Sequence, residues 1–107
     1  MAAAALLIQH EAAAQRFVAR LTAAGPELGE LTYVLAKAQM DLQHTFVAPS
    51  GRGMGVGARL AEAACEHARS QRYSLLASCS FLSDKFFVAN CPPGWRYDAK
   101  SKCAILQ

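Results

Sequence analysis

The chain has 107 residues, 53% of them hydrophobic, which is enough apolar sequence for a modest core and too much for a disordered chain. Its formal charge of +3 comes from scattered lysines and arginines, so nothing indicates nucleic-acid binding. No apolar run approaches the roughly 18 residues of a membrane span, and the alanine-rich start lacks the basic residues of a secretory signal. We therefore expect one intracellular domain over residues 1–107, cytoplasmic or nuclear, without a membrane partner.

The first half of the chain predicts an antiparallel meander of strands. Leu6-Leu7-Ile8 is a short apolar run, and residues alternate in character from Arg16 to Thr22, so these two segments are expected to pair as a hairpin. The alanines between them, Ala12–Ala14, could equally form a short helix. Alternation resumes from Glu30 to Lys37 and again from Met40 to Val47, which adds two more strands.

A helix is predicted from Gly53 to Gln71, after a break in the pattern at residues 48–51. Its apolar residues recur at helical spacing along one face, while charged residues share the other. The apolar positions are Val56, Leu60, Ala63, Ala64 and Ala68. A brief apolar strand from Tyr73 to Ala77 follows, and a strand–helix–strand unit requires it to run parallel to Met40–Val47 through a right-handed crossover.

The last part of the chain predicts a second, short helix. Apolar spacing from Phe81 to Val88 supports it, and nearby serines are candidate N-caps. The candidates are Ser78, Ser80 and Ser83. The remaining segment, Trp95 to Gln107, has no firm period, so it either follows the surface or adds a strand through Ala104–Leu106.

Four cysteines stand at positions 65, 79, 91 and 103, without the closely spaced pairs of structural zinc sites. We therefore expect no metal site and four free thiols. Cys65, inside the predicted helix, is most simply a small core residue. Cys79 differs because it stands where a strand ends and a helix begins, so that a thiolate there would lie at the positive end of a helix dipole.

Glycines at 51, 53, 55 and 57 form a loop between a strand and the long helix. Glycine lets the backbone take positive φ and approach a ligand closely, and the helix start leaves N–H groups free for an anion such as pyrophosphate. A P-loop would need a lysine after the last glycine, where Ala58 stands. A dinucleotide-binding fingerprint would need an acidic residue at the end of the next strand, where Ser78-Cys79-Ser80 stands.

What remains, Arg52-Gly53-Met54-Gly55-Val56-Gly57, resembles the acetyl-CoA pyrophosphate loop of the GNAT superfamily of N-acetyltransferases, with Arg52, Gly55 and Gly57 at its fixed positions. The run Asp41–Val47 and the segment Ser78–Phe81 are similar to those of small single-domain YjdJ-type members, over roughly residues 6–95. The resemblance implies a compact α+β GNAT-like fold, in which an antiparallel β-meander is followed by a helix, a parallel strand and a short helix. It also implies acetyl-CoA or coenzyme A as the cofactor.

The resemblance assigns the coenzyme contacts to two places. In the family, the backbone of the strand before the loop pairs with pantetheine, which here implies Thr45, Phe46 and Val47; ordinary core packing is the alternative for the side chains of Phe46 and Val47. The other implied contacts lie in the loop and at the start of the second helix. They are Arg52, Gly53, Met54, Gly55, Val56, Gly57 and Ser80.

Two residues are catalytic candidates. In the resembling family the cysteine at the position of Cys79 lies beside the acetyl group, as a nucleophile or as a wall of the site; a buried structural thiol is the alternative, and direct transfer to the amine is the family's habit. His44 could accept the amine's proton. Alternate residues of a strand share one face, so His44 is expected to point inward with Met40, Leu42 and Phe46. A core histidine is therefore the alternative.

The chain also departs from larger members of the superfamily. The connection from Leu21 to Leu31 is too short for the helices that wall their acceptor site, and Phe86 and Phe87 stand where a tyrosine would be expected on the last helix. Asp41 is an isolated carboxylate. The expected function is an acetyl-CoA-dependent N-acetyltransferase acting on an amine such as a protein lysine or a terminal amine, as a monomer or weak dimer. The alternatives are a coenzyme A binding module without turnover and a small interaction domain whose loop binds no coenzyme.

Overall fold

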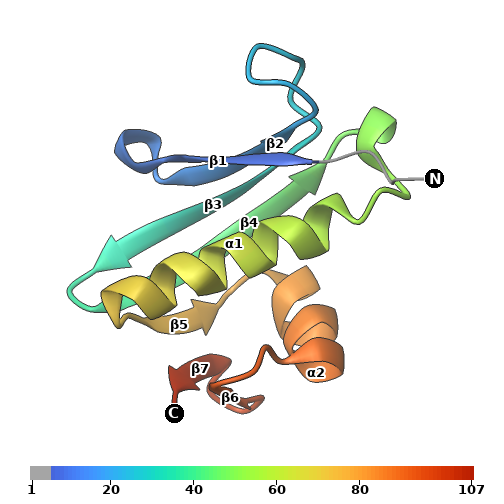
Figure 1. Cartoon of the computed structure of the whole chain (residues 1–107). Helices are drawn as coiled ribbons and strands as arrows, with labels where there is room; N and C mark the ends of the chain where they lie inside the picture. The colour runs from blue at the N-terminus through green and yellow to red at the C-terminus, as the bar shows by residue number, and fades with distance from the viewer. Residues whose placement is uncertain (1–5) are drawn as a thin grey trace.

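A twisted sheet crossed by one long helix is the frame of the structure (Figure 1). The computed structural model describes residues 6–107. The expectation that the alanine-rich start is no secretory signal falls partly on residues 1–5, which lie outside the described residues. In the described part the strands pair in the order β1-β2-β3-β4-β5-β7-β6. The strands are β1 (Leu7–Glu11), β2 (Arg16–Arg20), β3 (Gly29–Ala36), β4 (Gln39–Val47), β5 (Ser74–Ala77), β6 (Trp95–Asp98) and β7 (Cys103–Leu106). Within residues 6–107 no helix has the length and apolar character that crossing a membrane requires.

The predicted meander of β1 to β4 is confirmed, because each consecutive pair of these strands is antiparallel. Between β1 and β2 both expectations hold: the strands pair, and Ala12–Ala14 form one 3-10 turn that ends at Gln15 with a φ of 51°. β2 ends at Arg20 rather than at Thr22, and the Leu21 side chain is exposed.

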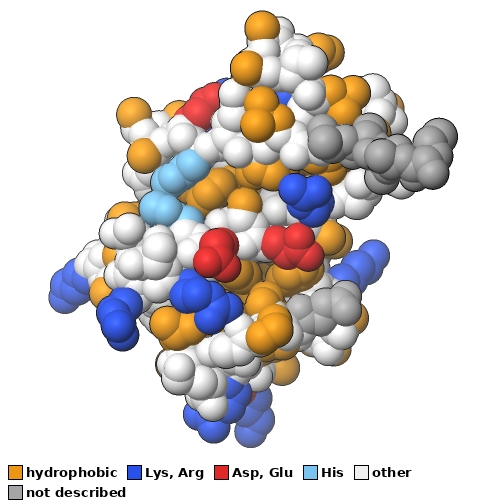
Figure 2. All heavy atoms as spheres, in the orientation of Figure 1, with side chains coloured by type: hydrophobic (Ala, Val, Ile, Leu, Met, Phe, Trp, Pro, Cys, Tyr) orange, Lys and Arg blue, Asp and Glu red, His pale blue; other side chains and the backbone are white. Residues whose placement is uncertain are grey.

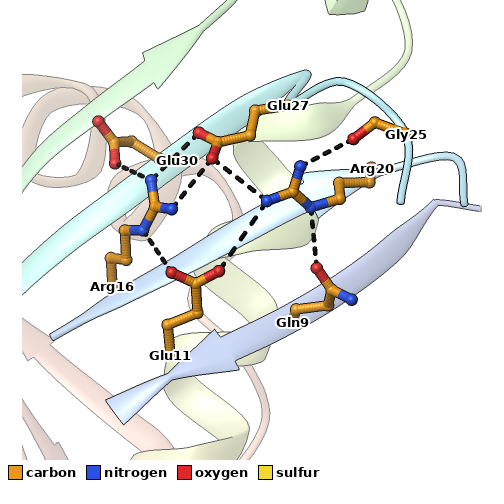
Figure 3. Close-up of polar contacts among 7 residues, drawn as sticks. All are labelled: Gln9, Glu11, Arg16, Arg20, Gly25, Glu27 and Glu30. Carbon is orange, nitrogen blue, oxygen red and sulfur yellow. Dashed lines mark hydrogen bonds and ion pairs between the residues drawn. The ribbon is translucent and has the colours of Figure 1, made fainter. Parts of the chain in front are cut away.

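A network of charged and polar groups holds the connection between β2 and β3 (Figure 3). Its members are Gln9, Glu11, Arg16, Arg20, Gly25, Glu27 and Glu30. The Arg16 guanidinium bonds three carboxylates at 2.8 to 3.0 Å, and Arg20 bonds Glu27 at 3.2 Å. The hydrogen bonds from Arg16 lower the pKa of Glu27. The connection is therefore fixed by ion pairs, and it holds no helix.

The long helix, α1 (Val56–Gln71), packs one face on the sheet. It begins at Val56 rather than at the predicted Gly53, because Gly53 and Gly55 have φ values of +83° and +73°, outside the right-handed helical region. The helix residues buried against the sheet are Val56, Leu60, Ala61, Ala64, Cys65 and Ala68. Small alanines let the helix approach the buried sheet side chains of Leu31, Met40, Leu42 and Leu75 closely, and full burial of each leucine contributes about 1.5–3 kcal/mol. After α1, β5 runs parallel to β4, as predicted.

Two histidine side chains lie side by side on the face that α1 crosses (Figure 2). The ring centroids of His10 in β1 and His67 in α1 are 4.3 Å apart, and His10 also stacks on Phe17 at 4.3 Å. The Nε2 atom of His10 lies 2.6 Å from the hydroxyl oxygen of Tyr33. Partial burial, and secondly the neighbouring His67, lower the pKa of His10. These contacts give both histidines a packing role at the end of α1 remote from the glycine loop.

The second helical segment is present, but it begins differently from the prediction. It consists of one π-helical turn, η3 (Leu82–Phe86), followed by α2 (Phe87–Asn90). The prediction of a serine cap was wrong, since neither element has a side-chain N-cap hydrogen bond. Instead the Cys79 carbonyl accepts the N–H groups of Leu82 and Ser83 at 3.1 and 2.9 Å.

The end of the chain forms a hairpin of β6 and β7. β7 pairs with β5, which confirms the alternative that Ala104–Leu106 adds a strand. The sequence did not indicate β6, whose Trp95 is nevertheless buried. Tyr97 of β6 stacks on Phe87, with ring centroids 5.0 Å apart, so the hairpin also supports the second helical segment.

A β-bulge in β4 changes which face its residues occupy. Thr32 pairs with His44 while Tyr33 pairs with Leu42, so Gln43 has no partner in β3. Before the bulge, Leu42 is fully buried on the α1 side; after it, His44 is exposed and Phe46 is 50% exposed on the opposite face, which we call the outer face. The expectation that His44 and Phe46 point inward with Leu42 was therefore wrong, because one extra residue reverses the alternation.

Candidate functional site

β4 and β5 pair over only part of their length. Their register runs from Gln39 opposite Ser74 to Leu42 opposite Ala77, and the Cys79 N–H then donates to the Leu42 carbonyl at 3.0 Å. β4 continues beyond this point to Val47 with β3 on one side, and the two strands diverge (Figure 1). Backbone groups of Gln43–Val47 on the side facing away from β3, which we call the open edge, can thus pair with an extended ligand.

The Cys79 thiol lies where the two strands separate. Its side chain is 8% exposed, and Sγ is 3.4 Å from Oγ1 of Thr45, across the start of the open edge. Thr45 thus faces Cys79 because the bulge has turned it to that side, and no sequence pattern indicated this contact. His44, the other catalytic candidate, lies on the outer face, so its side chain and that of Thr45 leave β4 on opposite sides.

The cysteines differ in environment. Burial raises the pKa of the Cys65 thiol to about 12, so this thiol stays protonated at neutral pH and acts as a small core residue, as predicted. All four cysteines fall within residues 6–107 and carry free thiols. Cys79 combines a free thiol with a position at the start of the open edge, next to Gln43.

The glycine loop is anchored at its beginning and open at its centre. The Ala48 N–H donates to the Leu28 carbonyl at 2.8 Å. Gly51 packs closely against the same carbonyl, because a Cβ on Gly51 would lie 2.8 Å from its oxygen. A Cβ at Gly53 or Gly55 would meet nothing within 4 Å, although both residues have positive φ. The loop therefore combines a fixed base with free space above two glycines.

The loop leads directly into the first turn of α1, where Gly55 is the N-cap residue. The first intrahelical bond runs from the Arg59 N–H to the Gly55 carbonyl at 3.0 Å, so the N–H groups before Arg59 have no carbonyl partner within the helix. Gly57 is needed for packing, since a Cβ there would lie 3.2 Å from the Phe81 ring.

A groove of about 340 Å³ follows the loop and the helix start. Its lining brings together several predicted coenzyme residues and adds Gly51, Ala58 and Phe81, which were not among the predicted contacts. The lining residues are Val47, Gly51, Arg52, Gly53, Gly55, Val56, Gly57, Ala58 and Phe81. Among the other predicted contacts, Met54 packs against the core, and Ser80 and Phe46 are exposed outside this groove.

Residues 16–90 match the family model described as GCN5-related N-acetyl-transferase. The chain belongs to this family. A GCN5-like putative N-acetyltransferase from Staphylococcus aureus has a similar structure, with a TM-score of 0.51 and 31% identity over 76% of each chain. Ard1 from Thermoplasma volcanium shares the fold, with a TM-score of 0.57 and 20% identity over 87% of this chain and 72% of that chain. Nourseothricin acetyltransferase is 29% identical over 58% of this chain, with a TM-score of 0.49, and the match spans 38% of its own length.

Two expected departures from larger members of the superfamily are present. The connection between β2 and β3 holds no helix, and the charged network covers that part of the outer face instead. Phe86 and Phe87 are buried. Tyr97 stacks on Phe87, and its hydroxyl donates to the Ser83 carbonyl at 3.3 Å. Burial raises the pKa of Tyr97.

Proposed function

We propose that residues 1–107 form one domain that transfers acetyl from acetyl-CoA to an amine, as a small N-acetyltransferase of the YjdJ type. The observation that carries the proposal is the continuity of two features of β4. The glycine-loop groove reaches the open edge at Val47, and a free thiol, Cys79, lies at the other end of that edge. Membership in the family supports the reaction class.

The coenzyme is held in two parts. Its pyrophosphate lies on the N–H groups of Gly53, Gly55, Val56 and Gly57, where the helix dipole and the positive charge of Arg52 both favour an anion. The Met54 N–H does not take part, because it donates to the Gly51 carbonyl at 3.3 Å. Its pantetheine arm is extended and carries amide groups, so it pairs with the backbone of Thr45–Val47 as an added strand would. This arrangement directs the thioester toward Cys79.

The transfer itself follows from the groups at that point. The amine nitrogen attacks the thioester carbon, the C–S bond breaks, and coenzyme A leaves as a thiolate that takes up a proton. Because Thr45 Oγ1 is placed to accept a hydrogen bond from Cys79, its own hydrogen is available for the carbonyl oxygen as that oxygen becomes negative. His44 receives the proton that the amine loses. The acceptor is an amine such as a protein lysine or a terminal amine.

A coenzyme A binding module with little turnover is the second candidate. It is favoured by Phe86 and Phe87, which replace the tyrosine that protonates the leaving thiolate in larger members of the superfamily. Both candidates require the same groove, so coenzyme binding does not separate them, whereas turnover does.

The test combines titration calorimetry, thiol release and intact-mass measurement. We expect coenzyme A to bind, acetyl-CoA to release free thiol in the presence of lysine-containing peptides, and no stable acetyl adduct to form without acceptor, since direct transfer is favoured. Cys79→Ala should then lower the rate about tenfold, a barrier increase of about 1.4 kcal/mol.

Other outcomes are equally informative. A stable adduct on Cys79, with several orders of magnitude lost in Cys79→Ala, would establish a covalent route. Binding without thiol release would support the binding module, and absence of coenzyme binding would contradict both candidates.

A further inference from the structure

A carboxylate lies on the outer face at the point where β4 and β5 separate. Met40 and Leu42 are fully buried on the α1 side, so Asp41 between them faces the other way. Ser78 Oγ donates to Asp41 Oδ1 at 2.6 Å, and Gln43 Nε2 donates to Oδ2 at 3.1 Å. These two bonds fix the orientation of the carboxylate.

The position of Asp41 relates it to the proposed acetyl site. Its partner Ser78 directly precedes Cys79, whose N–H in turn bonds the Leu42 carbonyl. Asp41 and Cys79 are thus connected through one hydrogen bond and one peptide unit, near the start of the open edge. The carboxylate is only partly exposed, so its charge is screened less than that of a fully exposed group.

The two sides of the open edge are occupied differently. On the α1 side the coenzyme groove continues into the glycine loop. On the outer face His44 and Ser78 are exposed, and Val34, which pairs with Asp41, is 44% exposed. A second substrate can therefore reach the thioester from the outer face while the coenzyme fills the other side.

We propose that Asp41 binds the ammonium group of the acceptor, which makes the substrate class a protonated primary amine presented to the outer face. The inference rests on the proposed function. An ammonium offers three donors, and each Asp41 oxygen keeps a lone pair after its bonds to Ser78 and Gln43. The exposed His44 on the same face takes one proton from the bound ammonium and passes it to solvent. The neutral amine then attacks the thioester carbon as in the proposed reaction, and the free imidazole can receive the second proton.

A purely structural role is the competing explanation, because the bond between Asp41 and Ser78 ties β4 to β5. The two roles predict different effects on ligand affinity when the charge of Asp41 is removed. A structural tie affects every ligand alike, whereas an ammonium site affects only ligands that carry a positive charge next to the coenzyme sulfur.

The experiment compares two thioethers of coenzyme A by calorimetry: S-(2-aminoethyl)-coenzyme A, which ends in an ammonium, and S-propyl-coenzyme A, which has similar size and no charge. We expect the parent protein to prefer the aminoethyl thioether at least tenfold, and Asp41→Asn to reduce this preference to less than about twofold with unchanged affinity for the propyl thioether. Glu62→Gln, which removes an exposed carboxylate from α1, is the control and should retain the preference. Ser78→Ala keeps the carboxylate and should retain most of it.

Three results would overturn the assignment: equal affinity of the parent for both thioethers, a retained preference in Asp41→Asn, or an equal loss of affinity for both thioethers in that variant. Asp41→Ser removes the same charge and replaces the Asn variant if the latter does not fold. Failure of the parent to bind coenzyme A itself would instead contradict the proposed function.

Discussion

Two glycines with similar positive φ values allow an effect on coenzyme binding to be distinguished from an effect on stability. Gly55, in the loop, and Gly94, before β6, have φ values of +73° and +87°. Alanine at either position is strained by roughly 1–2 kcal/mol. Only at Gly55 would the added methyl group enter the proposed pyrophosphate space, so we expect Gly55→Ala to weaken coenzyme A binding at least tenfold by calorimetry.

Gly94→Ala is the matched control, because its Cβ would meet only the guanidinium group of Arg69, whose Nη1 would lie 2.7 Å away, and because Gly94 lies far in sequence from the glycine loop. Both variants should lose comparable stability in urea, whereas Gly94→Ala should keep the coenzyme affinity of the parent. Equal affinities in the two variants would contradict a pyrophosphate site over Gly55.

Single residues also show how far the sequence predicts the site. The glycines at 53, 55 and 57 indicated the loop because positive φ and close approach restrict the residue type. The contact between Cys79 and Thr45 was not predictable, because it depends on the separation of two strands and on a bulge between them. Asp41 gave no signal either, since its partner Ser78 is remote in sequence.

The packing of β3 against the start of α1 gives a prediction at the scale of elements. A Cβ at Gly29, the first residue of β3, would lie 2.7 Å from Cγ1 of Val56 and 2.8 Å from the Phe46 carbonyl oxygen. Gly29→Ala should therefore overpack the core, lower the free energy of unfolding by about 1–3 kcal/mol, and weaken coenzyme binding by displacing the helix start. Urea unfolding and calorimetry measure the two effects.

Val56→Ala provides the partner for a double-mutant cycle. It removes the nearest atom that the new methyl group would meet in α1, and it leaves in place the Phe46 carbonyl and Leu60 Cδ1, the latter 3.4 Å away. The double variant should hence recover part of the stability that simple addition would subtract. Strict additivity would show that the contact with α1 is not the source of the strain.

Elements with a regular period were predictable, and irregular ones were not. The alternation in β3 and the helical spacing in α1 reflect burial of one face. In β2, by contrast, Phe17, Val18 and Ala19 are all buried, so both faces of this strand are covered. The bulge at Gln43 reversed the predicted facing of His44 and Phe46, because the pattern carries no mark of an extra residue. β6 escaped prediction because its short span, Trp95–Asp98, is stabilised by contacts with β7 and α2 rather than by a local pattern.

At the scale of the whole molecule, the sheet consists of two parts with one short junction. β1 to β4 form one part, and β5 to β7 form the other. The two parts are joined by the pairing of Gln39–Leu42 in β4 with Ser74–Ala77 in β5, and α1 packs over this junction (Figure 1). The separation leaves the open edge, and it also means that a ligand in this space would connect both parts.

Hydrogen exchange of the backbone amides tests this arrangement, because it reports local opening segment by segment. Coenzyme A consists of a phosphorylated adenosine diphosphate and a pantetheine arm. We expect the whole coenzyme to slow exchange both at residues 51–58, through the pyrophosphate, and at residues 43–47, through strand-like pairing with the arm. Adenosine 3′-phosphate 5′-diphosphate lacks the arm and should slow exchange locally at residues 51–58 alone. If both ligands protect residues 43–47 equally at matched saturation, the pantetheine arm does not occupy the open edge, and the proposed approach of the thioester to Cys79 is wrong.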